Sequence, residues 1–170
     1  MSEVLPWLEY KWNFDFPAGM YRAVLERLHG TPARIEEMLR AAPAQALASR
    51  YNGKWSVLEH VGHLWILDAE LHGPRVAQFL RGDATLAAAD MSNQATFDRD
   101  FNAMNAAQVC AGFRAARAEM LRVLDPLSPA DAQRSALHPR LQKQMRLVDM
   151  CFFAAEHDDH HLAAMRELLR

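Results

Sequence analysis

Hydrophobic positions recur at three- and four-residue steps along most of the chain, which is the period of an amphipathic helix. Alternating Val, Ile and Thr runs typical of strands are almost absent, so the pattern predicts no strand. The sequence therefore predicts an all-α protein: an up-and-down antiparallel four-helix bundle that forms a single domain over residues 1–170, with an extra N-terminal helical segment. The helical patterns cover about residues 16–29, 32–42, 56–80, 106–124 and 147–169.

Local residue choices predict where these helices begin and break. The first pattern stops at "HGTP", and Thr31 is expected to cap a new helix that has a proline in its first turn. Ser56 and Glu59 form the S-x-x-E capping box of the next helix. Gly73 and Pro74 are expected to kink or split that helix.

Charge and composition exclude several classes of partner. The net charge is −2 and no cluster of lysine and arginine stands out, which argues against binding to nucleic acid or to an anionic membrane. The sequence shows no apolar run long enough to cross a membrane, and its N-terminal pattern is not that expected of a signal peptide. Cys110 and Cys151 lie among apolar neighbours and are expected to be buried free thiols, typical of a cytoplasmic protein.

Aromatic residues are concentrated near the N-terminus. They are expected to cover one end of the bundle, to form a contact between subunits, or simply to pack in the core. The residues are Trp7, Tyr10, Trp12, Phe14 and Phe16.

The stretch "EHDDHH" places three of the eight histidines in five positions of the last predicted helix. His157 and His161 continue the apolar stripe of that helix, so their rings should point inward, one turn apart, where both can bind one metal ion. The alternative is a histidine cluster at a helix surface or interface. Asp158 and Asp159 are expected to be exposed, unless one of them orients a histidine ring.

A third ligand can come from "EHVGHLW" on the second long helix, where the geometry allows either His60 or His63. Three imidazoles with open coordination positions suit catalytic zinc, and nickel or ferrous iron would also accept them. Glu70 lies too far along the helix from His63 to share the same ion and is expected at the rim or in solvent.

Four segments together carry a family resemblance: "LHGTPARIEEML", "KWSVLEHVGHLWILDAE", "HPRLQKQMRLVDM" and "AEHDDHHLAAM". The combination and order of these segments resemble those of the DinB-like (YfiT-like) superfamily. The resemblance implies a four-helix bundle in which three histidines bind a divalent metal ion. By motif, these would be His63, His157 and His161, whereas His60 and His160 would pack or support without binding the ion.

The resemblance also implies a function. Relatives include metal-dependent transferases of low-molecular-weight thiols such as bacillithiol and mycothiol, a thiol-dependent isomerase, and proteins described only as hydrolases. The leading hypothesis is therefore a metal-dependent thiol S-transferase that acts on a small molecule, with a homodimer as the expected assembly. A metal-dependent hydrolase and a non-catalytic binding or stress-response module with structural histidines are the alternatives. Arg75 and Arg146 are candidates for binding an acidic thiol, although each is more commonly a solvated arginine.

Overall fold

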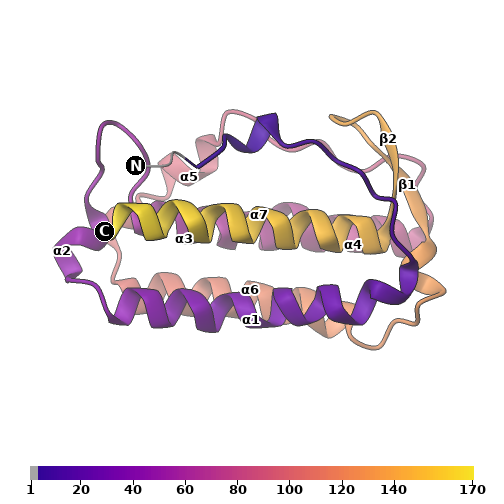
Figure 1. Cartoon of the computed structure of the whole chain (residues 1–170), viewed down its shortest axis with the longest axis horizontal. Helices are drawn as coiled ribbons and strands as arrows, with labels where there is room; N and C mark the ends of the chain where they lie inside the picture. Colours follow the sequence, from indigo (N-terminus) through magenta and orange to yellow (C-terminus); the bar gives the residue numbers. More distant parts are fainter. Residues whose placement is uncertain (1–3) are drawn as a thin grey trace.

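Four long helical segments lie side by side in the computed structural model, which describes residues 4–170 (Figure 1). One of the four is composite: α3 continues through a π-helical turn into α4. The predicted bundle is confirmed, and the segments are α1 (Tyr21–Arg40), α3 (Val57–Leu67), the π-helical turn (Asp68–His72), α4 (Gly73–Arg81), α6 (Ala106–Leu124) and α7 (Leu147–Leu168).

The connections determine the direction of each segment. The short helix α2 (Ala44–Ala48) lies in the turn between α1 and α3, which are antiparallel. Residues 82–105, which contain α5 (Gln94–Asp98), return along the bundle, so α6 runs in the same direction as α3 and α4 (Figure 1). The chain then reverses once more into α7. The bundle therefore departs from simple up-and-down alternation at this one long connection.

The predicted break at "HGTP" is wrong, because α1 runs through it without interruption. Pro32 has no N–H to donate to the carbonyl group of Leu28, four residues earlier. That carbonyl instead accepts a hydrogen bond from Arg117 Nη1 at 3.0 Å. Thr31 is not a helix cap: its buried hydroxyl lies 3.1 Å from the carbonyl oxygen of Arg27 and donates to a carboxylate of α7.

The other helix signals are confirmed. Ser56 and Glu59 form a reciprocal capping box at the start of α3. The break at Gly73 takes the form of the π-helical turn, in which the N–H of Gly73 bonds to the carbonyl oxygen of Asp68. A Cβ atom at position 73 would lie 2.9 Å from that oxygen, so the close approach requires glycine.

A small hairpin precedes α7, contrary to the prediction of no strand. Strands β1 (Ser135–His138) and β2 (Lys143–Arg146) pair antiparallel. Each strand has only four residues, and "SALH" and "KQMR" contain no β-branched side chain, so neither shows the usual strand pattern. Their side chains at Ala136 and Met145 are buried against the bundle.

The N-terminal segment has two 3₁₀ turns, Trp7–Glu9 and Ala18–Met20, and is extended between them. It runs along α7 rather than across an end of the bundle (Figure 1, indigo). The rings of Trp7 and Trp12 pack 5.0 and 4.7 Å from the ring of Phe153. The predicted aromatic cover therefore exists, but it lies over the side of α7.

The hydrophobic core consists of two clusters separated by polar residues. One cluster holds the start of α1, the end of α6 and the start of α7, and the other holds the opposite halves of these helices. On each helix a buried polar side chain lies between the two clusters. We call these residues the polar layer: Thr31, Asp68, His72, Arg117 and Asp158.

The predictions for the two cysteines are also confirmed. Cys110 and Cys151 are buried and free, and burial raises the pKa of their thiols to about 11 and about 12. Over the described residues, no helix combines the length and apolar character that crossing a membrane requires.

Candidate metal centre

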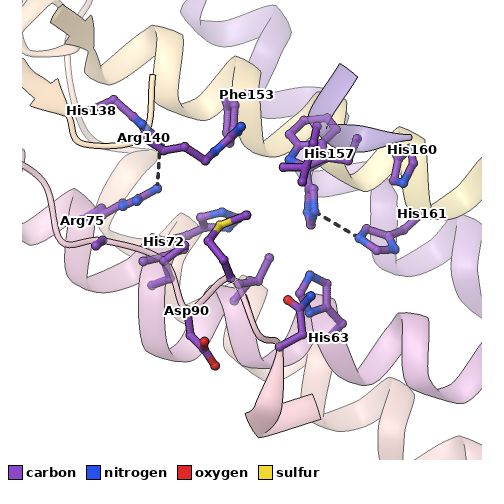
Figure 2. Close-up of a pocket in the computed structure, with 18 of the residues that line it drawn as sticks. His63, His72, Arg75, Asp90, His138, Arg140, Phe153, His157, His160 and His161 are labelled. Carbon is purple, nitrogen blue, oxygen red and sulfur yellow. Dashed lines mark hydrogen bonds between the residues drawn. The ribbon is translucent and has the colours of Figure 1, made fainter. Parts of the chain in front are cut away.

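Three buried histidines from two helices converge beside the N-terminal segment (Figure 2). His63 comes from α3, and His157 and His161 come from successive turns of α7. One ring nitrogen of each lies within 4.8 Å of those of the other two. We call these three residues the histidine cluster. The structure thus brings together the three residues that the resemblance indicated.

Neighbouring polar groups orient two of these rings. The Nδ1 atom of His161 lies 2.7 Å from Nδ1 of His60, and Nδ1 of His63 lies 3.2 Å from the hydroxyl oxygen of Thr96. The Nε2 atoms of His161 and His157 face each other at 3.1 Å. With Nδ1 engaged, each oriented ring has Nε2 free to bind an ion, the arrangement in which outer partners fix a metal-ligating histidine. Sequence reasoning missed Thr96, because a single threonine in the short helix α5 carries no recognisable motif.

The protonation of these rings also fits a metal ion. Burial lowers the pKa of His63 to about 3 and that of His60 to about 4, and it lowers the pKa of His157 and His161 well below the usual value. The rings are therefore neutral near pH 7, which is the form that binds metal. Neutral, converging, buried nitrogens are the donor set of a three-histidine site.

His160 lies outside the group of converging nitrogens. Its ring packs edge-on against Tyr10, with centroids 5.7 Å apart, and 5.8 Å from the ring of Trp7. Trp7 also packs edge-on against His157 at 4.6 Å. The N-terminal aromatics therefore cover α7 at the histidine cluster.

A cavity of about 560 Å³ opens beside the histidine cluster. Its apolar lining includes Leu67, Leu71 and Phe153. Arg75, His138 and Arg140 lie at the end remote from the cluster (Figure 2). Arg75 is 1% exposed, so the expectation of a solvated side chain is wrong for this residue.

Arg146 is not among the described residues that line the cavity. Its guanidinium group donates to Asp149 at 2.6 Å and to the carbonyl oxygens of Phe14 and Phe16. It therefore ties the N-terminal segment to the start of α7.

The acidic residues near the site differ in their burial and in their ion-pair partners. Asp158 is 1% exposed and accepts two hydrogen bonds from Arg117, so the prediction that it is exposed is wrong. Its side chain belongs to the polar layer, where it contacts Arg117 of α6 and Thr31 of α1. Asp159 is partly exposed and pairs with Arg27 and Arg34. Glu70 is exposed, as expected, and pairs with Arg99.

The sequence model of the DinB superfamily matches residues 24–165. YfiT from Bacillus subtilis, described as a probable metal-dependent hydrolase with an unusual four-helix bundle topology, is 19% identical with a TM-score of 0.75, covering 94% of this chain and 91% of YfiT. The four-helix bundle protein TT2238 is 20% identical with a TM-score of 0.64, covering 86% of this chain and 98% of TT2238. No curated protein matches the chain. The family match over most of the chain shows that this protein belongs to the DinB superfamily.

Proposed function

We propose that the protein is a metal-dependent enzyme acting on a small molecule, with a divalent zinc, nickel or iron ion held by His63, His157 and His161. The observation that carries the proposal is the convergence of three buried, neutral imidazoles beside a cavity of about 560 Å³. Three protein ligands leave open coordination positions, where a divalent ion increases the acidity of a thiol or a water molecule. A site of this size accepts a small molecule.

Thiol S-transfer is the reaction that the cavity favours. Asp90 is the only carboxylate among the described residues that line it, and its oxygens already accept hydrogen bonds from Ser92 and Gln94. A thiolate is itself a strong nucleophile, so its attack needs no carboxylate base. The thiol cosubstrate, the homodimer and the cytoplasmic location stay predictions from the sequence.

A hydrolase is the second candidate, and one contact favours it. His72 lines the cavity, and its Nδ1 lies 3.2 Å from Oδ1 of Asp68 in the polar layer. A carboxylate that fixes one nitrogen of an imidazole leaves the other able to accept a proton, which is the role of a general base. The similarity to YfiT is compatible with this second reading.

The decisive first experiment is elemental analysis of protein purified without a histidine tag. We expect about one transition-metal ion per chain in the wild type and almost none in His157→Ala, because two imidazoles hold an ion much less tightly than three. His160→Ala is the matched control: it removes a neighbouring imidazole outside the cluster and should keep the metal. Absence of metal from the wild type, with no uptake of added zinc, nickel or iron, would refute the proposal.

A second measurement separates the two reactions. Cobalt(II)-loaded protein is titrated with 2-mercaptoethanol, and thiolate binding is followed by the sulfur-to-cobalt charge-transfer absorption. Appearance of that band supports thiol chemistry. Its absence, together with hydrolysis of simple esters or amides that His72→Gln abolishes, would support the hydrolase.

A further inference from the structure

The end of the cavity remote from the histidine cluster is lined by three nitrogen-rich side chains (Figure 2). Arg75 comes from α4, His138 from the end of β1, and Arg140 from the hairpin turn. We call these three residues the cationic end of the cavity. They are far apart in sequence, and only the fold brings them together.

Arg75 is a buried charge without a counter-charge. Its Nε and Nη2 atoms donate to the carbonyl oxygen of Ala87 at 2.9 and 2.6 Å, and that oxygen is neutral. Among the described residues, no carboxylate forms an ion pair with Arg75, and burial together with nearby Arg140 lowers its pKa to about 10. Since buried charges in proteins are normally paired, this arginine lacks the partner that its environment requires.

The contact between Arg75 and His138 does not supply that partner. The backbone N–H of Leu141 can only donate, and it donates to Nδ1 of His138 at 3.2 Å. A neutral imidazole has one acceptor nitrogen and one N–H, so the proton must be on Nε2. Nη1 of Arg75 lies 3.4 Å from that Nε2. Two donors therefore face each other at this distance, and neither can accept a hydrogen bond from the other.

Arg140 adds a second positive charge at the same place. Its guanidinium group lies 5.9 Å from the centre of the Phe153 ring, and the described residues provide it with neither a hydrogen-bond acceptor nor an ion pair. The cationic end thus combines two unpaired guanidinium groups with an imidazole N–H. Such convergent donors match the oxygens of a carboxylate or phosphate group.

We propose that the cationic end of the cavity binds an oxyanion, a carboxylate or phosphate group of the substrate, through Arg75, His138 and Arg140. The inference rests on the proposed function only in taking the cavity as the substrate site, and it adds an anionic end to the substrate. The Cα atoms of His63 and Arg75 are twelve residues apart on one composite helix, roughly 18 Å along its axis. The composite helix contributes Leu67 and Leu71 to the lining between the two ends, together with His72. The substrate is therefore an elongated small molecule with an anionic group at one end and its reacting group at the other.

The test uses matched ligands and metal-free protein, so that anion binding is measured without the metal site. Hexanoate and hexanamide have the same chain and differ in charge. Isothermal titration calorimetry should show hexanoate binding at least about tenfold more tightly, because hydrogen bonds to charged groups are stronger than neutral ones. Hexyl phosphate, titrated in parallel, shows whether carboxylate or phosphate is the better oxyanion.

Variants then show which residues cause the preference for hexanoate over hexanamide. Arg140→Gln removes an exposed charge for which the described residues provide no ion pair, and it should reduce the preference for hexanoate without unfolding the protein. Arg75→Gln should abolish the preference, with circular dichroism as the check on folding. The matched control is Arg81→Gln, which removes an exposed arginine of the same helix α4 that pairs with Asp83. This control should bind hexanoate as the wild type does.

Equal affinity of the wild type for hexanoate and hexanamide would overturn the proposal, as would a preference that survives both Arg140→Gln and Arg75→Gln. If Arg75→Gln does not fold, the affinities of the wild type and of Arg140→Gln for hexanoate and hexanamide still test the proposal. The outcomes are separable from the fate of the metal site. Hexanoate selectivity without metal uptake would refute only the proposed function, and metal uptake without selectivity would refute only the anion site.

Discussion

Arg117 in the polar layer and Arg75 at the cationic end of the cavity are both 1% exposed, but their surroundings differ in every other respect. Arg117 makes five hydrogen bonds, four of them to the carboxylates of Asp68 and Asp158. Burial alone would lower its pKa, yet the two carboxylates raise it above its usual value. Arg75 contacts one neutral carbonyl group and an imidazole, and its pKa is lowered.

This difference distinguishes polar groups that are buried to hold the fold together from polar groups that are buried to bind a ligand. In the polar layer every N–H of the guanidinium group has an acceptor within the protein, so the layer joins α1, the π-helical turn, α6 and α7 without a ligand. At the cavity, nitrogen atoms are buried with few protein partners, and Nδ1 of His157 has none in the described part of the chain. Unsatisfied buried groups persist in folded proteins mainly where a ligand satisfies them.

The largest effect is expected from Arg117→Met. Removing this guanidinium group leaves two buried carboxylates without their arginine counter-charge and the Leu28 carbonyl group without its donor, and the free energy of unfolding should fall by about 3–5 kcal/mol. Arg122→Met is the control on the same helix, since Arg122 is exposed, and should change stability by less than about 0.5 kcal/mol. Urea denaturation measures both. Similar stabilities for the two variants would mean that the polar layer is not the structural region we describe.

A smaller effect is expected at the histidine cluster from His60→Ala. His60 holds Nδ1 of His161 and so positions a metal ligand without belonging to the converging set. Loss of such a supporting contact should weaken metal affinity about 10- to 100-fold. Competition titration with a chromophoric chelator measures the affinity, and His60→Asn should restore part of it. Unchanged affinity in His60→Ala would show that the packing of the helices alone orients His161.

The smallest effect concerns the loss of stability at acid pH that His138 causes at the cationic end of the cavity. Burial, Arg75 and Arg140 lower the pKa of His138 to about 4, below the value of 6.5 expected for an unfolded chain. The unfolded chain therefore takes up a proton at higher pH than the fold does, and stability falls as the pH drops from near 6.5 toward 4.

Replacing His138 should therefore reduce the dependence of stability on pH. Between pH 7 and 5 we expect metal-free wild type to lose up to about 2 kcal/mol more free energy of unfolding than His138→Asn. Urea titrations at several pH values test this. Parallel pH profiles for the two proteins would show that folding does not shift the pKa of His138, and an added oxyanion should flatten the wild-type profile.

The features that sequence reasoning captured are local. The capping box at Ser56 and Glu59 and the one-turn spacing of His157 and His161 depend on residues three or four positions apart, where helix geometry alone determines the contact. The bounds of α6 and α7 also follow from local periodicity and are confirmed to within a residue. The choice of His63 over His60 needed the family resemblance, because both side chains lie near the same face of α3.

The features that were missed depend on contacts between distant segments. The helix break expected at Pro32 does not occur, because the orphaned Leu28 carbonyl group receives its donor from α6. Asp158 looked exposed because its buried partner, Arg117, is 41 residues away. Likewise, Arg75 and Arg140 come together only through the hairpin, whose short strands carry no pattern that a sequence reader would recognise.

The π-helical turn sets the rotational register between the two ends of the cavity. In an uninterrupted α-helix, twelve residues at about 100° each would place Arg75 roughly 120° around the axis from His63. One residue absorbed by the π turn makes the effective separation eleven, which leaves the two side chains only about 20° apart. Figure 2 shows both projecting into the same space. A single-residue insertion or deletion in this turn is thus a discrete evolutionary step that joins these two ends in one cavity or turns them apart.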